Sequence, residues 1–324
     1  MGLINFSSRL LKLLAVLGLL TFLVCFGCSR SADNEVIDFS KTIPVPRPEA
    51  KSRQQRALRV AVGAMISPKE TFVYYQQILD YISRSIGKES ELIQRKTYAE
   101  INELFGKGEI DLVFICSGPY ATGREKYGFE LLATPQVLGS HFYNSYLIVN
   151  KNSSIYSLGD LRGRVFAFTD PQSNTGKLVP TYWLMQMGER PETFFRKTIY
   201  TYSHDNAIVA VAKGLVDGAA IDGLIWEYYH HKFPAFTSST RIIKKSEPHG
   251  IPPLVAARHL SPQDKENIRK LLFSMHQDPE GKKVLESLMI DRFVPPKEEW
   301  YDAIIQMEKK LASLPAAPHA LSQP

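Results

Sequence analysis

Short apolar runs alternate along this chain with stretches of helical periodicity, and this alternation constrains the fold more than any other feature. Eight of the runs have the length and composition of strands: residues 58–62, 91–94, 111–115, 146–149, 165–168, 198–200, 218–221 and 254–257. Strands that alternate with helices build parallel sheets with helices on both faces. The sequence therefore predicts an α/β fold.

Two helices in this body have clear starts. Ser67 and Ser261 are each followed by proline and, three residues on, by an acidic residue. This pattern is typical of an N-cap serine with proline in the first helical turn. The body, from about residue 58 to 313, is long enough for two α/β lobes.

The first 27 residues have the features of a secretion signal. Arg9 and Lys12 precede an apolar run at residues 13–26, which is shorter than the roughly 20 residues that span a bilayer. The run leads to Gly27 and Cys28, the small residue and cysteine that a lipoprotein signal peptidase requires. We expect cleavage there and lipid attachment at Cys28. A signal anchor and ordinary cleavage are the alternatives.

Residues 28–57 are polar, rich in proline and basic, which predicts an extended tether on a membrane. Cys25 would leave with the signal and Cys28 would be modified, so Cys116 would have no partner for an intrachain disulfide. The net charge of +6 falls largely on the signal and the tether. No basic cluster is interleaved with aromatic residues, so we expect no nucleic-acid partner.

Residues 170–176, Asp-Pro-Gln-Ser-Asn-Thr-Gly, follow an apolar run and open a helical stretch. The unpaired N–H groups of such a helix start and the helix dipole favour an anion. The hydroxyls of Ser173 and Thr175 can join them. Alternatively, one of these residues merely caps the helix. Because an interior proline costs on the order of 3 kcal/mol, Pro180 predicts a kink or a loose first turn.

Several polar residues fall at or just after the ends of predicted strands. In open α/β sheets, ligands bind beyond the carboxyl ends of the strands. The residues placed in this way are Ser67, Ser117, Ser173, His204 and Asp222. We therefore expect a binding site to which several strand ends contribute.

Over about residues 58–290 the chain resembles the substrate-binding proteins of phosphonate, phosphite and phosphate ABC importers. The resemblance rests on residues 97–99, 111–113, Tyr143 ahead of 147–151, 170–176, 203–207 and 216–222. It implies the type II periplasmic-binding-protein fold, with a mostly parallel sheet in each lobe and the ligand in the cleft between lobes. The implied division is 58–148 plus 252–313 for lobe I, 149–251 for lobe II and 314–324 for a tail.

The resemblance also implies a set of donors for a phosphorus oxyanion. The residues that it assigns are Tyr98, Tyr143, Ser173, Asn174, Thr175, His204 and Asp222, with Ser67 and Ser117 as further candidates. Each role has a competitor, because Tyr98 can simply begin a helix, Tyr143 can pack in a sheet, and a lone histidine is usually structural. The resemblance further implies that this protein lies outside the cytoplasm, that its partners are an ABC permease and its ATPase, and that it holds neither a cofactor nor a metal.

Departures from the family bear on the choice of ligand. Members that take aminoalkylphosphonates hold the ammonium with acidic side chains, whereas the nearest matching positions here are Leu224 and residues 250–253. Asp222 can accept a hydrogen bond from a P–OH group, which sulfate lacks at neutral pH. We therefore expect phosphite, phosphate or a small alkylphosphonate rather than aminoethylphosphonate.

Two other functions fit parts of the sequence. Ser173, His204 and Asp222 can be drawn as a hydrolase triad, although the Gly-x-Ser-x-Gly elbow is missing. A tethered sensor that feeds a signalling receptor would have the same fold. Metal binding by His230 and His231 or by His249 lacks ligand spacing, and the first two are expected to end a helix.

Overall fold

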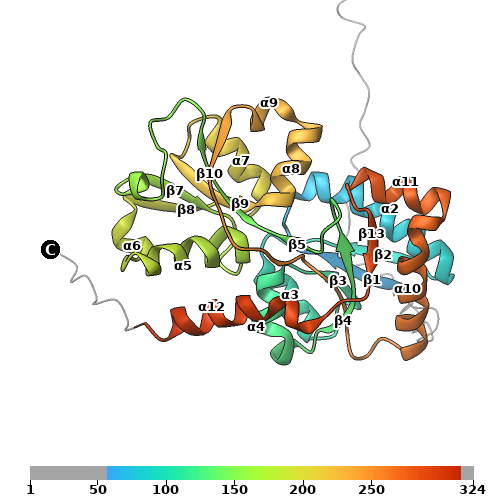
Figure 1. Ribbon diagram of the computed structural model, residues 1–324. Helices are drawn as coiled ribbons and strands as arrows, with labels where there is room; N and C mark the ends of the chain where they lie inside the picture. Colours follow the sequence, from blue (N-terminus) through green and yellow to red (C-terminus); the bar gives the residue numbers. More distant parts are fainter. Residues whose placement is uncertain (1–56, 315–324) are drawn as a thin grey trace, which may run out of the picture. The chain divides into compact units, whose positions relative to one another are not determined.

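The structure, a computed structural model, describes residues 57–314 (Figure 1). The predicted secretion signal, Cys28 and nearly all of the predicted tether lie outside the described residues, as does the predicted tail after residue 314. The described chain forms two large sheets, each covered by helices, and a small third sheet.

Lobe I is built on a sheet with the strand order β13-β4-β12-β3-β1-β2. Its strands are β1 (Leu58–Val62), β2 (Ser90–Ile93), β3 (Leu112–Phe114), β4 (Glu130–Gln136), β12 (Leu254–Ala256) and β13 (Arg292–Val294). Its helices are α2 (Pro68–Ile86), α3 (Tyr98–Gly106), α4 (Ser117–Tyr127), α10 (Pro262–Ser274) and α11 (Pro279–Ser287). Strand β1 is parallel to β2 and β3, whereas β12 is antiparallel to both of its neighbours.

Lobe II is built on a second sheet with the strand order β10-β6-β9-β7-β8. Its strands are β6 (Ser145–Asn150), β7 (Val165–Phe168), β8 (Lys197–Tyr200), β9 (Gly218–Asp222) and β10 (Thr240–Lys245). Its helices are the π-helical turn η3 (Asn174–Leu178), α5 (Val179–Gln186), α6 (Pro191–Phe194), α7 (His204–Ala212), α8 (Gly223–Lys232) and α9 (Pro234–Thr237). The predicted end of α8 at His230 and His231 is confirmed, since both lie in its last turn.

The chain passes between the lobes twice, and the two passages pair with each other. Strand β5 (Phe142–Tyr143) is antiparallel to β11 (His249–Gly250), with Tyr143 opposite His249. The predicted lobe boundary after residue 148 is therefore wrong, because it falls inside β6, whose Ser145 already pairs with Asp222 of lobe II. The first passage occurs at residues 142–143. These two aromatic residues have polar neighbours on both sides, so no apolar run marks the passage in the sequence.

The last helix, α12 (Asp302–Ala312), packs on α4 of lobe I and on α5 of lobe II. Tyr301, Ile304 and Met307 are the residues of this segment that are buried. The predicted assignment of residues 302–313 to lobe I alone is corrected accordingly: an amphipathic helix placed at the junction buries its apolar face against both lobes.

The predicted α/β class is confirmed, but the sheets are mixed rather than mostly parallel. All eight predicted apolar runs are strands, whereas β4, β10, β13 and the short pair β5 and β11 are not among them. Strands β10 and β13 lie at sheet edges and carry charged residues, which blunt an edge against further pairing. A search for apolar runs in the sequence does not detect such strands.

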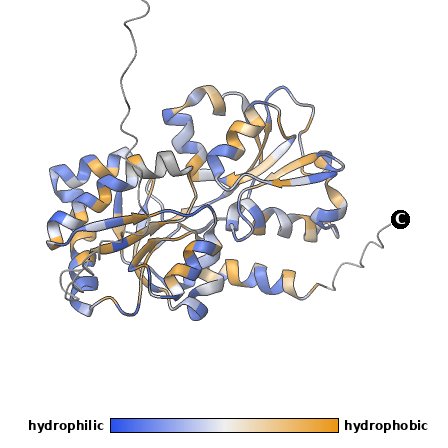
Figure 2. Ribbon diagram, turned by 180° about the vertical axis from the view of Figure 1, so that it is seen from behind, coloured by the Kyte–Doolittle hydropathy of each residue, from blue (hydrophilic) through white to orange (hydrophobic). Residues whose placement is uncertain are grey.

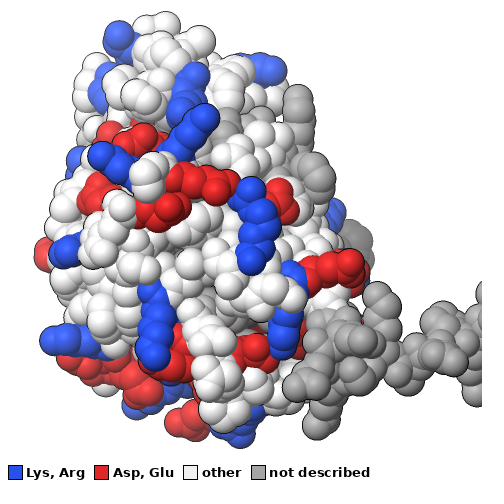
Figure 3. All heavy atoms as spheres, turned by 90° about the vertical axis from the view of Figure 1, so that its right-hand side faces the viewer, with Lys and Arg blue, Asp and Glu red and all other residues white. Residues whose placement is uncertain are grey.

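Hydropathy follows this layering. The strands of both sheets are largely hydrophobic, while the outer faces of the helices are hydrophilic (Figure 2). On the face that Figure 3 shows, Lys and Arg side chains alternate with Asp and Glu side chains. Ion pairs occur in lobe I, such as that of Lys88, in the loop after α2, with Asp264 of α10 at 2.7 Å. That face therefore presents no patch of one sign.

Candidate functional site

Two helix starts from different lobes meet at one point of the structure. Gly118, in the first turn of α4, lies so close to lobe II that an added Cβ would be 2.5 Å from the carbonyl oxygen of Gln172. The same Cβ would be 2.9 Å from the backbone nitrogen of Asn174, where η3 begins. Helix starts carry unpaired N–H groups and a positive dipole end. Their convergence provides the surroundings that an anion needs.

The wide turn η3 follows from the residues around Pro180. The hydroxyl of Ser173 caps it by accepting a hydrogen bond of 3.0 Å from the N–H of Gly176. In a π-helical turn, residue 180 would donate to the carbonyl of Thr175, but proline has no N–H. The hydroxyl of Ser145 donates to that carbonyl instead, at 2.7 Å. The loose first turn predicted from Pro180 is confirmed as this π-helical turn.

Buried polar atoms without a partner collect around these helix starts. Among the residues that the structure describes, they include Tyr98 Oη, Asn174 Oδ1, Thr175 Oγ1 and His204 Nε2. Buried polar groups are rarely left unpaired, so each of them calls for an explanation. Three of the four can donate a hydrogen bond. A ligand with several acceptor oxygens would satisfy them together.

Tyr143 joins the two lobes at this point. Its hydroxyl lies 2.5 Å from the hydroxyl of Ser117, and the side-chain amide of Asn174 donates to it at 3.2 Å. Tyr98 reaches the same region from the start of α3, where Thr97 and Glu100 form a complete capping box. Tyr98 therefore begins a helix, as the competing interpretation held, and its hydroxyl is also buried without a partner.

His204 is held as a neutral donor. Its Nδ1 accepts a hydrogen bond of 2.8 Å from the backbone N–H of Asp222, which assigns the ring proton to Nε2. Burial lowers the pKa of His204 to about 3, so the ring stays neutral at physiological pH. The Nε2–H group is one of the unpaired donors described above.

Asp222 ends β9 and caps α8. Its Oδ1 accepts from the backbone N–H of Leu224 at 2.8 Å and of Ile225 at 3.4 Å. Burial raises the pKa of this carboxyl to about 7, because the charged form is poorly solvated there. Asp222 thus caps α8 through Oδ1, and its other oxygen, Oδ2, takes part in neither of these hydrogen bonds.

Ser67 is bonded to the start of α7 through its backbone. Its backbone N–H donates to Oδ1 of Asp205 at 2.9 Å, at the start of α7. It precedes α2 without a side-chain capping bond to that helix. Ser261, by contrast, caps α10 through the backbone N–H of Asp264, as its sequence pattern predicts.

Cys116 and Asp170 belong to the same region, although neither was predicted to be a site residue. Cys116 is the N-cap residue of α4, and the backbone N–H groups of Asn174 and Gly118 donate hydrogen bonds to its sulfur. Burial raises the pKa of the thiol to about 11, so it is neutral. Asp170 accepts from the backbone N–H of Tyr98 at 3.1 Å and so links α3 to the turn before η3. Both follow strand ends, a signal that would have found them.

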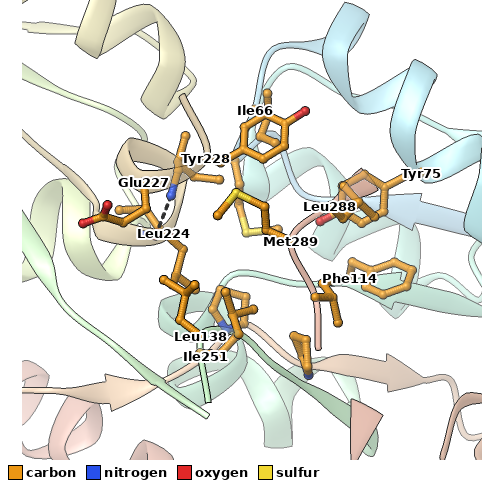
Figure 4. A pocket seen from close by; sticks show the side chains of 17 residues that line it. Ile66, Tyr75, Phe114, Leu138, Leu224, Glu227, Tyr228, Ile251, Leu288 and Met289 are labelled. Carbon is orange, nitrogen blue, oxygen red and sulfur yellow. Dashed lines mark hydrogen bonds between the residues drawn. The ribbon is translucent and has the colours of Figure 1, made fainter. Parts of the chain in front are cut away.

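A cavity of about 90 Å³ adjoins Asp222. Residues from both lobes line it, and most of them are apolar (Figure 4). Among the residues that the structure describes, no cluster of His, Cys, Asp or Glu is arranged for a metal ion. Within the same range, no helix is both long enough and apolar enough to cross a membrane.

The fold and these donors define a two-lobed, type II periplasmic binding protein. The family model for periplasmic substrate-binding proteins of phosphonate ABC transporters matches residues 60–301. The chain belongs to this family.

Individual relatives agree with this assignment. The chain is 25% identical over 246 residues to the phosphonates-binding periplasmic protein of Escherichia coli (strain K12), covering 74% of this chain and 72% of that protein. It is 26% identical over 181 residues to a probable ABC transporter phosphite binding protein of Prochlorococcus marinus (strain MIT 9301), covering 52% of this chain and 61% of that protein.

Two solved structures share the fold. A binding protein component of an ABC phosphonate transporter from Pseudomonas aeruginosa superposes with a TM-score of 0.76 at 24% identity, covering 82% of this chain and 91% of that one. The Prochlorococcus marinus protein PhnD1, solved in complex with methylphosphonate, gives 0.72 at 21% identity, covering 80% and 99%.

Proposed function

We propose that this protein binds a small phosphorus oxyanion without covalent chemistry and delivers it to an ABC permease and its ATPase. The observation that carries the proposal is the set of buried, unpaired donors near the facing starts of α4 and η3: Tyr98 Oη, Thr175 Oγ1 and His204 Nε2. A tetrahedral oxyanion offers acceptors in several directions at once. The hydroxyls of Ser117 and Tyr143 stand beside these donors and add to the set.

The same geometry argues against a hydrolase. In a Ser-His-Asp triad, the carboxylate accepts from the Nδ1–H group of histidine. Here Nδ1 of His204 is itself an acceptor, and its donor is the backbone of Asp222 rather than the side chain. The hydroxyl of Ser173 is the cap of η3. The three residues therefore serve binding and capping rather than a catalytic relay.

The ligands that fit best are phosphite, phosphate and alkylphosphonates. Asp222 is buried, and burial raises its pKa to about 7, so it can share a proton with a P–OH group near neutral pH. Sulfate has no such proton at that pH. A buried carboxylate facing a fully deprotonated anion costs binding free energy.

The family is periplasmic, and we infer that a lipid on Cys28 keeps the protein at a membrane outside the cytoplasm. The residue pair Gly27 and Cys28 after the apolar run supports this inference. A lipid label should be incorporated by the wild type and not by Cys28→Ala. Equal labelling of the two proteins would refute the anchor.

Calorimetry on the full-length protein in mild detergent tests the function. Phosphite, phosphate, methylphosphonate and sulfate are titrated in turn into the wild type and into Asp222→Asn. We expect binding of the phosphorus oxyanions and little binding of sulfate to the wild type. The variant should lose about 1–3 kcal/mol for protonated ligands and discriminate less against sulfate. If no phosphorus oxyanion binds, the proposed function is wrong.

A further inference from the structure

The cavity beside Asp222 differs in character from the cluster of donors. Its lining is largely hydrocarbon, with aromatic and sulfur-containing side chains, and it draws on both lobes. Figure 4 shows Met289 among the labelled side chains at its centre, with Tyr75 and Phe114 on one side and Leu224 on the other. Asp222 is the residue that the cavity shares with the donor site.

Tyr143 connects the two regions through its own two ends. Its hydroxyl contacts Ser117 and Asn174 in the donor site. Its ring packs in one cluster with Val137 and Ile251, both of which line the cavity. A ligand held by the donors therefore has the apolar cavity within reach on the far side of this ring.

Charge is scarce in the lining. Asp222 and Glu227 are its only acidic members, and no basic residue is among them. The carboxylate of Glu227 accepts from Tyr146 Oη at 3.0 Å, and Figure 4 shows it pointing away from the cavity. Oδ1 of Asp222 is occupied by the start of α8. The cavity is thus suited to a group without charge.

Two strained residues line the cavity from two different loops. Leu138 and Met289 both have left-handed backbones, with φ of 51° and 56°. Such conformations are uncommon outside glycine, and they tend to persist where the surroundings fix a functional geometry. The loops are bonded to each other, since Gly139 N–H donates to Oδ2 of Asp291 at 2.7 Å and Asp291 N–H donates to the carbonyl of Gln136 at 2.8 Å.

We infer that this cavity holds an uncharged hydrocarbon substituent on the phosphorus atom of the ligand, while the unpaired donors hold the oxyanion. The preferred ligand is then an alkylphosphonate longer than methylphosphonate, rather than phosphite or phosphate. The cavity volume of about 90 Å³ leaves room for such a group, since a single water needs only about 10–15 Å³. This inference rests on the proposed function and narrows it to one class of substrate.

A pair of ligands with the same number of heavy atoms tests the inference directly. Propylphosphonate and 2-aminoethylphosphonate differ only in that a methyl group replaces an ammonium group at the end of the chain. Both are titrated, beside methylphosphonate, into the full-length wild type in mild detergent. A buried methylene contributes about 0.8 kcal/mol, or roughly fourfold in affinity. Propylphosphonate should therefore bind roughly 15-fold tighter than methylphosphonate and also tighter than 2-aminoethylphosphonate.

The variant Leu224→Glu places a carboxylate in the lining. It should reverse the order of propylphosphonate and 2-aminoethylphosphonate. Leu215→Glu is the matched control, because Leu215 is 70% exposed and does not line the cavity. This control should keep the wild-type order.

The outcomes distinguish a failure of the cavity assignment from a failure of the proposed function. If methylphosphonate binds and propylphosphonate binds no better, the inference about the cavity is wrong and the proposed function stands. An unchanged ligand order in Leu224→Glu would likewise overturn the cavity assignment. If none of the phosphonates, phosphite or phosphate binds, the proposed function fails and the inference fails with it.

Discussion

Nδ1 of His204 accepts a hydrogen bond of 2.8 Å from the backbone N–H of Asp222, so the last residue of β9 fixes the tautomer of the first residue of α7. The proton that remains, on Nε2, has no partner among the described residues. A strand end thus aims a donor from a neighbouring helix, without using the carboxylate of Asp222.

Replacement of His204 by asparagine should separate these two functions of the ring. The amide oxygen can take over the acceptor role of Nδ1, but nothing replaces the Nε2–H donor. A hydrogen bond to a charged group contributes about 1.5–3 kcal/mol, so methylphosphonate affinity should fall by that amount. Calorimetry measures the affinity, and urea unfolding should show a smaller change. An affinity equal to that of the wild type would remove His204 from the site.

The stability of the wild type relative to Asp222→Asn should depend on pH in a way that follows from the raised pKa of Asp222. The pKa of Asp222 rises from 3.8 to about 7 on folding, so the folded protein holds a proton that the unfolded chain releases between these values. This contribution to stability is present in full below pH 3.8 and is lost as the pH rises to about 7.

As the pH falls from about 7 to about 4, the free energy of unfolding of the wild type should therefore rise relative to that of Asp222→Asn, by at most about 1.4 kcal/mol per pH unit. His204 works in the opposite sense, because its folded pKa is lowered to about 3 and its contribution is lost in acid. The two groups offset each other in the wild type. Urea unfolding across this range measures the difference, and a constant difference between the two proteins would contradict the raised pKa.

Much of the fold could be predicted from the sequence because apolar runs reveal buried strands whatever their direction. The direction itself depends on where the chain crosses between lobes. Strands β6 and β12 each follow such a crossing and run against their neighbours, which local apolarity does not encode. The crossing at Phe142 and Tyr143 is set by pairing with His249, about a hundred residues away.

The donors of the candidate site lie at strand ends and in the motifs of the family resemblance, so the sequence could indicate them. It could not indicate their partners. The bond between His204 and Asp222 and the thiol of Cys116 beside Asn174 depend on packing between elements distant in sequence. The apolar cavity could not be predicted from the sequence either, because its lining comes from segments of both lobes whose apolar residues resemble those of an ordinary core.

Gly118 should be essential for the meeting of the two helix starts. A Cβ at this position would lie 2.5 Å from the carbonyl oxygen of Gln172, so Gly118→Ala must push α4 away from the turn before η3. Overpacking of this kind costs about 1–3 kcal/mol, and methylphosphonate affinity should fall roughly 5- to 150-fold.

Gly159→Ala is the control for this prediction. Its added Cβ would have only the hydroxyl of Ser157 nearby, at 3.5 Å, and should change nothing. Calorimetry measures the methylphosphonate affinity of both variants. Wild-type affinity in Gly118→Ala would show that the two helix starts can separate without loss of the ligand.

Ser145 and Pro180 should be coupled through one carbonyl group. The hydroxyl of Ser145 donates to the backbone oxygen of Thr175 at 2.7 Å, the acceptor that proline at position 180 leaves unused. Ser145→Ala would leave this buried oxygen unpaired, at a cost of about 1–3 kcal/mol in the free energy of unfolding. In a Pro180→Ala background the new N–H can reach the same oxygen, so Ser145→Ala should cost less there. Urea unfolding of both single variants and the double variant measures this coupling, and additive effects would mean that the two residues act independently.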